Sequence, residues 1–353
     1  MKNIFKGIII TLAAVSLFSC AKVVSESSNQ AHKRYLEAWI SVHAPQTERA
    51  GRGIYVYPDA TVEGDGATVE KDGFAIVRYV SRDLNGTITS YTDEEYAKQL
   101  GEYSESAYYG IDIFTTTDET IRAGISDALL GMKAGGKKKF IIPSWLMSYS
   151  YYKTEAEYFA VASDQNSSIF DLELIDFAKN INNWQLARME ECFNNPNFYN
   201  GAFEGTTIAD STSLGFYFKM LNKVENKKEY PSDTTIYINY TGKLLDLPKY
   251  YGNGLVFDTT IEKTAKDNYI WSSAKKYTPV SIRWAEESKD ITMGESTLVS
   301  GFTQTLWNMA NCAPGTKAVG VFYSDLGYGY NGSGSIPAYA PLVFEIEIVE
   351  KPE

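Results

Sequence analysis

Near its C-terminus the chain carries a series of aromatic and apolar residues with one carboxylate among them. They occur in order as Tyr-Thr-Gly at 240–242, Phe-Asp at 257–258, Gly-Phe at 301–302 and a glycine-flanked tyrosine at 328. None of these side chains is a strong nucleophile. They can instead enclose an apolar group in a dry pocket and orient a polar group at its rim, which is chemistry without a covalent step.

The rest of the composition excludes several other kinds of active site. Only two histidines are present, His32 and His43, and both precede the first expected domain. His-based triads and His-rich metal sites are therefore excluded from the domain cores, and we expect no metal and no cofactor. Cys192 and Cys312 are assigned to different repeats, and two such residues do not establish a disulfide.

Length and charge narrow the class of protein. The chain has 353 residues, a formal net charge of -11 and 14% aromatic residues. This length allows two folded domains with separate cores. The acidic balance argues against a nucleic-acid partner, which would require clustered Lys and Arg. The one basic run, at 137–139, precedes the apolar residues 140–142 and is interpreted as the solvated face of a strand.

The N-terminus has the layout of an export signal. Two lysines precede an apolar run at 8–18 that is too short to span a bilayer. Residues 17–20 read Leu-Phe-Ser-Cys and resemble a bacterial lipobox. That resemblance implies a signal peptide at 1–19, a lipidated Cys20, and attachment to the bacterial envelope on the periplasmic or surface face of the outer membrane. An ordinary cleaved signal, with Cys20 incidental, is the alternative.

The chain also contains one pattern twice, which argues for a duplicated domain. Four segments recur at near-constant offsets: 53–56 with 215–218, 75–79 with 236–240, 124–132 with 301–309, and 169–174 with 343–348.

The repeat sets the expected domain boundaries. We expect a lipidated tether with an N-terminal helix at 20–50, a first domain at 51–177, a helical linker at 178–214 and a second domain at 215–353. Apolar residues at helical spacing indicate the helix in the tether and the helix in the linker.

Within each unit the pattern predicts mostly strands. Apolar and polar residues alternate at 235–240, 318–323 and 342–349. One internal helix is indicated after Gly301, so the expected class is α+β, with a single helix packed on an antiparallel sheet. The apolar stripe of this helix consists of Phe302, Leu306 and Met309. The matching stripe of the first unit consists of Ile125, Leu129 and Met132.

The order of these motifs resembles that of the FKBP-type peptidyl-prolyl cis-trans isomerases. The end of the chain contributes to the resemblance, because Tyr328 leads through Ile336-Pro337 into the alternating strand at 342–347. The resemblance implies an α+β fold of two tandem FKBP-like domains, each a twisted antiparallel sheet wrapped around one short helix. It also implies that the second domain isomerises X-Pro peptide bonds and that the first is degenerate.

Prolyl isomerisation suits a chain that is poor in nucleophiles. Rotation about the X-Pro bond passes through a twisted amide, with a barrier of roughly 18 to 20 kcal/mol, and breaks no bond to carbon. The enzyme needs an apolar pocket for the proline ring and polar groups that favour the twisted state.

The resemblance further implies which residues form this pocket. Tyr240 would be a wall, and Phe302 the floor, where many members have tryptophan. The hydroxyl of Tyr328 would bond the substrate carbonyl. Asp258 would orient polar groups at the rim, or merely cap a turn. The full set is Tyr240, Phe257, Asp258, Leu298, Val299, Phe302, Tyr328, Ile336 and Phe344.

Two parts of the chain depart from the family pattern. An insertion at 261–292 replaces the segment that usually carries a basic residue and a further wall phenylalanine, for which Val280 is the match. We hypothesise that it forms a flap that narrows substrate choice. In the first unit Tyr79 matches the wall tyrosine, but no Phe-Asp pair follows, and Ile125 replaces the floor aromatic. A scaffold, a dimerisation surface and a peptide-holding module remain open for this unit.

The expected function is therefore prolyl isomerisation of envelope or surface proteins by a membrane-anchored protein. Its partners would be proline-containing polypeptides and, through the lipid anchor, a membrane; the sequence does not fix the oligomeric state. One alternative is a non-catalytic peptide-binding or assembly module. A surface glycan-binding lipoprotein is the third reading, supported by the aromatic residues of the insertion.

Overall fold

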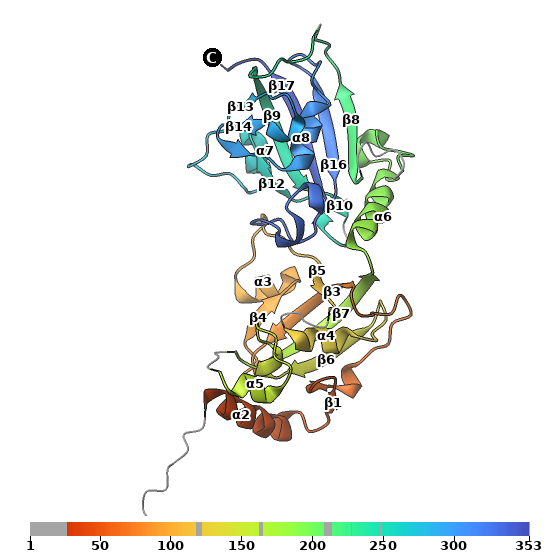
Figure 1. The fold of residues 1–353 in the computed structure, drawn as a ribbon, viewed down its shortest axis with the longest axis vertical. Helices are drawn as coiled ribbons and strands as arrows, with labels where there is room; N and C mark the ends of the chain where they lie inside the picture. The colour runs from red at the N-terminus through yellow and green to blue at the C-terminus, as the bar shows by residue number, and fades with distance from the viewer. Residues whose placement is uncertain are drawn as a thin grey trace, which may run out of the picture.

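Two antiparallel sheets, one after the other along the chain, make up the body of the protein (Figure 1). The computed structural model describes residues 27–117, 122–161, 165–207, 214–226, 228–247 and 249–352. The expected signal peptide and Cys20 lie outside the described residues.

The first sheet is built around the long strand β3, which pairs with β7, β4 and β5. Its strands run in the order β1-β2-β6-β7-β3-β4. The elements of this part are α2 (Ser28–His43), β1 (Glu48–Ala50), β2 (Ile54–Val56), β3 (Phe74–Arg82), β4 (Ile88–Tyr91), α3 (Glu94–Leu100), β5 (Asp112–Thr115), α4 (Ala123–Leu129), β6 (Lys137–Ile142), α5 (Glu155–Phe159) and β7 (Ser168–Ala178).

The second sheet is built in the same way around β9, which pairs with β17, β12 and β13. Its main path is β15-β14-β13-β9-β17-β16-β8. The elements are α6 (Ile181–Phe193), β8 (Phe216–Asn222), β9 (Thr235–Leu244), β10 (Asp246–Leu247), β11 (Gly252–Asn253), β12 (Val256–Thr259), α7 (Glu262–Asp267), β13 (Val280–Arg283), β14 (Thr292–Met293), β15 (Ser296–Thr297), α8 (Ser300–Trp307), β16 (Lys317–Phe322), η7 (Gly329–Asn331) and β17 (Leu342–Val349).

The two sheets share a common arrangement of strands: β2, β6, β7, β3, β4 and β5 correspond to β8, β16, β17, β9, β12 and β13, whereas β1, β14 and β15 have no counterpart. Tyr79 of β3 lies opposite Leu172 of β7, and Tyr240 of β9 lies opposite Ile346 of β17. In both sheets a helix, α4 or α8, immediately precedes the strand β6 or β16. The pairing of equivalent strands supports the duplication that the sequence repeat indicates.

Close packing of α8 on its sheet explains two glycines. A Cβ on Gly301 would lie 2.3 Å from the ring of Phe322, and one on Gly320 would lie 1.9 Å from Oγ1 of Thr305. Only hydrogen fits at these positions, so the helix can approach the strand directly. The predicted apolar stripe faces this contact, because Phe302, Leu306 and Met309 are all buried.

The α+β class predicted from the sequence is confirmed. The predicted helices before each sheet are present as α2 and α6, with Leu36 and Trp184 on their buried sides. The expectation of one internal helix per unit is too simple, because α3, α5 and α7 also form. These helices are five to seven residues long, which is too short for a periodic apolar pattern to reveal them.

The helix α6 lies where the two sheets meet, and its side chains contact both. Trp184 Nε1 donates to Asp176 of β7 at 2.9 Å, and Arg188 donates to the hydroxyl of Tyr250 at 3.0 Å. The backbone N–H of Ile111 also donates to the carbonyl of Tyr250. One apolar cluster continues across this junction, from Ile111 in the first unit into the core of the second.

Other kinds of site were sought in the described part of the chain. Cys192 and Cys312 are buried free thiols there. Within the same residues no group of three or more His, Cys, Asp or Glu side chains could hold a metal ion. No helix within these ranges has both the length and the apolar character that crossing a membrane requires.

Candidate active site

Four aromatic rings, which we call the aromatic cup, pack together on the helix-facing side of the second sheet; Tyr240, Phe302 and Phe344 are buried, and Phe257 is partly buried. Phe344 of β17 is the centre, with the ring of Phe302 at 4.9 Å, that of Phe257 at 5.6 Å and that of Tyr240 at 6.2 Å. Phe302 and Phe257 meet Phe344 nearly edge-on, at 87° and 75°. Edge-to-face packing of this kind fixes ring orientation.

A glycine under the cup allows the rings to come this close. A Cβ on Gly242 would lie 2.6 Å from the ring of Phe257 and 2.7 Å from that of Phe344. This contact gives a physical reason for the glycine in the Tyr-Thr-Gly motif, because any larger side chain would push the two rings apart.

Polar groups lie beside the aromatic cup. The hydroxyl of Tyr240 donates to Oδ2 of Asp258 at 2.6 Å, and Nζ of Lys275 contacts Oδ1 of the same carboxylate. Burial, together with the bond to Asp258, raises the pKa of Tyr240 above its ordinary value. The phenol therefore stays protonated and donates to the carboxylate throughout the neutral pH range.

Tyr328 belongs to the same group of residues. It is half-buried and packs against the core, and burial together with the nearby charge of Asp258 raises its pKa. A protonated phenol at this place is a hydrogen-bond donor. The remaining predicted residues pack against the same core: Leu298 and Val299 are partly buried just before α8, and Ile336 is 6% exposed.

Lys275 was not among the residues predicted from the sequence. It comes from the insertion and supplies the positive charge that pairs with Asp258. Lys275 and its neighbour Lys276 carry no periodic or motif signal, so sequence reasoning could not select Lys275. The insertion was expected to take the place of the family's basic residue, yet it provides a basic residue of its own.

The flap hypothesis needs a correction in its extent. Residues 280–283 form β13, which pairs with β9 over four residues and is part of the sheet. Val280, the match for the wall phenylalanine, is a member of this strand and partly buried. Only α7 and the segment that leads from it to β13 remain as candidates for a flap.

The family comparison agrees with this geometry. The family model for FKBP-type peptidyl-prolyl cis-trans isomerases matches residues 226–349, which contain the whole aromatic cup. This part of the chain belongs to the FKBP-type family. No match to the chain was found among curated proteins.

Solved structures of several FKBP proteins are similar to the chain. The three FKBP domains of wheat FKBP73 share 18% sequence identity over 84% of this chain and 94% of theirs, with a TM-score of 0.27. FkpA from Escherichia coli shares 23% over 50% of this chain and 72% of its own, with a TM-score of 0.29. A peptidyl-prolyl cis-trans isomerase from Pseudomonas syringae shares 22% sequence identity over 47% of this chain and 93% of its own, also with a TM-score of 0.29.

The first sheet carries an altered version of the polar pair in the FKBP-type domain. Ser90 lies opposite Ser81, as Asp258 lies opposite Gly242, and its hydroxyl is 3.1 Å from that of Tyr79. A hydroxyl therefore stands where the FKBP-type domain has a carboxylate. The acidic residue near Tyr79 is instead Asp112 of β5, whose Oδ2 accepts a hydrogen bond from the Tyr79 hydroxyl at 3.4 Å.

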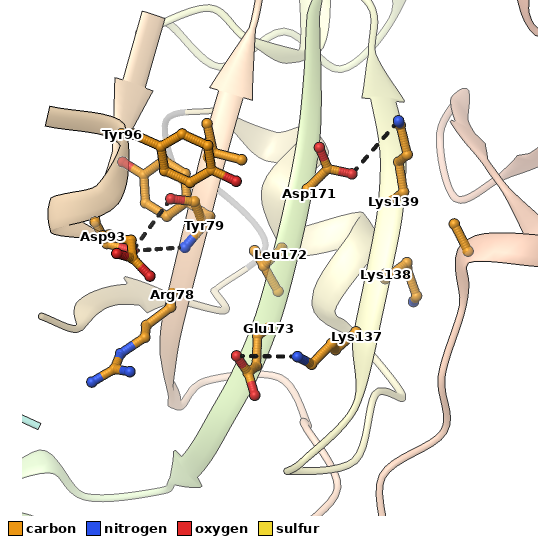
Figure 2. Close-up of a pocket in the computed structure, with 13 residues that line it drawn as sticks. Arg78, Tyr79, Asp93, Tyr96, Lys137, Lys138, Lys139, Asp171, Leu172 and Glu173 are labelled. Carbon is orange, nitrogen blue, oxygen red and sulfur yellow. Dashed lines mark hydrogen bonds and ion pairs between the residues drawn. The ribbon is translucent and has the colours of Figure 1, made fainter. Parts of the chain in front are cut away.

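The opposite face of the first sheet has a shallow hollow of about 340 Å³ (Figure 2). Its floor carries alternating charges, and they are paired across neighbouring strands: Lys137 with Glu173 at 3.6 Å and Lys139 with Asp171 at 3.7 Å. The basic run at 137–139 is thus the solvated strand face that the sequence predicted. Arg78, Asp93 and Tyr96 also line the hollow.

Proposed function

We propose that the FKBP-type domain catalyses cis-trans isomerisation of X-Pro bonds in extended polypeptides. The observation that supports this most directly is the Tyr240–Asp258 hydrogen bond beside the cup of Phe257, Phe302 and Phe344. An apolar cup beside a fixed polar pair is the arrangement that a non-covalent isomerase requires.

In this proposal each part of the site has a separate task. The cup binds the proline ring and excludes water. Water stabilises the polar planar amide more than the less polar twisted form, so its exclusion lowers the barrier to rotation. Tyr328 donates a hydrogen bond to the substrate carbonyl. Asp258, oriented by Tyr240, sets the field around the twisted amide, and binding the twisted form more tightly than the planar forms accelerates rotation.

The decisive experiment measures exchange between cis and trans forms of a short X-Pro peptide by NMR. The protein would begin at residue 21, which retains every residue described in the structure. The double variant Asp258→Leu, Tyr328→Phe should lose the acceleration while keeping its fold. A folded wild-type protein that accelerates none of several X-Pro peptides would overturn the proposal.

A non-catalytic peptide-binding module is the second candidate, and the Lys275 contact favours it. By neutralising Asp258, Lys275 reduces the field that the carboxylate can exert on a substrate. In this case Lys275→Gln would leave exchange uncatalysed and change only the affinity for peptide. Faster exchange in Lys275→Gln would support the catalytic reading instead.

We further propose that the protein is anchored to the envelope membrane through a lipid on Cys20 and acts on exported proteins there. Support comes from the charged, apolar and Leu-Phe-Ser-Cys segments of the N-terminus. Metabolic labelling with an alkyne fatty acid should mark the wild-type protein and not Cys20→Ala. Equal labelling of both would disprove the anchor.

A further inference from the structure

A cleft of about 380 Å³ lies between the first sheet's unit and the FKBP-type domain. One side is formed by the segment that runs from α3 to Tyr109, which reaches toward the FKBP-type domain in Figure 1. The other side is formed by residues 254–255, just before β12, and by residues 267–269 at the end of α7. Asp258 of the candidate active site lies between these two segments in the sequence, in β12.

Tyrosine rings form the walls of this cleft. Tyr103 and Tyr109 stack with their centroids 5.7 Å apart and 12° between their planes. The hydroxyl of Tyr108 donates to the carbonyl of Tyr250, and that of Tyr251 to the carbonyl of Tyr339. These bonds fix two of the walls, so the rings are held in place before any ligand arrives.

The cleft is also negatively charged. Glu94, Glu105 and Asp267 line it, and among its described lining residues there is no lysine or arginine. Lys263, which is not a lining residue, pairs with Asp267, so the acidic character of the cleft comes mainly from the segment that follows α3. The segment 93–105 contains five acidic residues and one basic residue, Lys98. Lys98 pairs with Glu94 at 2.9 Å and lies 5.0 Å from the centre of the Tyr103 ring. An amine is thus already held over one of these tyrosines.

Tyr269 has a backbone conformation that its side chain does not favour. Its φ is 58°, and it follows the end of α7, where Ile270 N–H donates to the carbonyl of Ala265 and Tyr269 N–H to that of Lys266. Glycine is the usual residue at this place in such a helix end. The ring is 67% exposed, so burial of the ring does not compensate for the strain. Retention of a strained residue on a cleft wall is characteristic of ligand-contacting positions.

We propose that this cleft binds an extended polypeptide segment that carries lysine or arginine. The cation lies over the tyrosine rings and is attracted by the acidic segment 93–105. This inference rests on the proposed function: the FKBP-type domain, which forms one side of the cleft, acts preferentially on X-Pro bonds that have basic residues nearby in the chain.

The test uses fluorescent peptides with one central Ala-Pro bond and either lysine or glutamate on both flanks. Binding of each peptide to the protein that begins at residue 21 is measured by fluorescence anisotropy at two salt concentrations. Cis-trans exchange at the Ala-Pro bond is measured by NMR. The lysine peptide should bind more tightly by about tenfold, and the preference should shrink with added salt.

Two variants test the cleft directly. Tyr269→Gly removes the ring and the unfavourable φ together, so the protein should be no less stable but should bind the lysine peptide about three- to fivefold more weakly. Glu105→Lys should reduce the lysine preference by a similar factor. The controls are Tyr35→Ser and Glu295→Lys, which change an exposed tyrosine and an exposed acid outside the cleft and should leave binding unchanged.

The outcomes separate this inference from the proposed function. One outcome is that the protein prefers the lysine peptide, that Tyr269→Gly and Glu105→Lys reduce this preference, and that exchange is not accelerated. This outcome supports the cleft as a binding site and rejects the isomerase activity. Equal affinity for both peptides together with accelerated exchange rejects the cleft alone. Loss of binding that is equal in the cleft variants and the controls also rejects the cleft.

Discussion

Gly242 is the residue on which the shape of the aromatic cup depends most. Its missing Cβ leaves room for the rings of Phe257 and Phe344. We predict that Gly242→Ala lowers the free energy of unfolding by about 1 to 3 kcal/mol, the usual cost of overpacking a core. Chemical denaturation measures this change, and peptide binding should fall with it.

A second variant checks the cause of that loss. Phe257→Leu makes space beside residue 242, so Gly242→Ala should cost less stability in its presence than in the wild-type protein. If the two changes are simply additive, the contact between residue 242 and the ring is not responsible.

Asp112 provides a pH-dependent test in the first unit. Burial raises its pKa above the ordinary value of 3.8, and the hydrogen bonds from the backbone N–H of Ile113 and the hydroxyl of Tyr79, with the charge of Arg122, oppose this shift only in part. The folded state therefore binds more protons than the unfolded state, so this contribution to stability is complete below about pH 3.8 and is lost as pH rises through the folded pKa.

We predict that Asp112→Asn removes the decrease in the free energy of unfolding that ionisation of Asp112 causes as the pH rises. The free energy of unfolding of the variant, relative to the wild-type protein, should increase from pH 4 to pH 7. Denaturant titrations at several pH values measure it, and a difference that stays constant or decreases with pH would contradict the assignment.

Sequence and structure agree best where a residue belongs to an ordered motif. Tyr240, Phe257, Phe302 and Phe344 were predicted as a set, and strand alternation plus helical spacing bring their rings together. Lys275 was missed because the pair Lys275-Lys276 belongs to no periodic pattern or motif. Its contact with Asp258 depends on how the insertion folds back.

At the scale of elements, the insertion divides into two parts with different roles. The strand β13 extends the sheet, whereas α7 and the segment after it lie at the rim near Asp258. The four residues of β13 are too few for a distinct period of two, so the sequence could not separate them from the insertion. The short helices α3 and α5 escaped prediction for the same reason.

This division predicts two different deletion outcomes. Replacing residues 262–278 by a short Gly-Ser linker should keep the fold, at a cost of about 1 to 3 kcal/mol for the buried Ala265, and should broaden peptide preference. Replacing 262–292 removes β13 as well and should prevent folding. Circular dichroism and peptide binding distinguish the two, and equal behaviour of both deletions would contradict the division.

At the scale of the whole molecule, the two units share part of their core. Ile111 of the first unit packs in the same apolar cluster as the second, and Arg188 of α6 links Asp176 to Tyr250. We therefore expect the two units to unfold in one cooperative transition.

Arg188→Ala tests this coupling. It should lower stability by about 1 to 3 kcal/mol, because a charged hydrogen bond between the units is lost. The matched control is Arg283→Ala, which breaks an exposed ion pair with Asp233 within the second unit and should cost under about 1 kcal/mol. Calorimetry measures both, and equal effects would show that Arg188 does not couple the units.

The position of β17 has a consequence for how the chain matures during synthesis. This strand comes last among the described elements, yet it lies in the middle of its sheet, between β9 and β16. While residues 342–349 are still in the ribosome, β9 and β16 have no partner between them. The second sheet thus stays open until these residues have emerged, and a chain stalled before them exposes two unpaired strand edges.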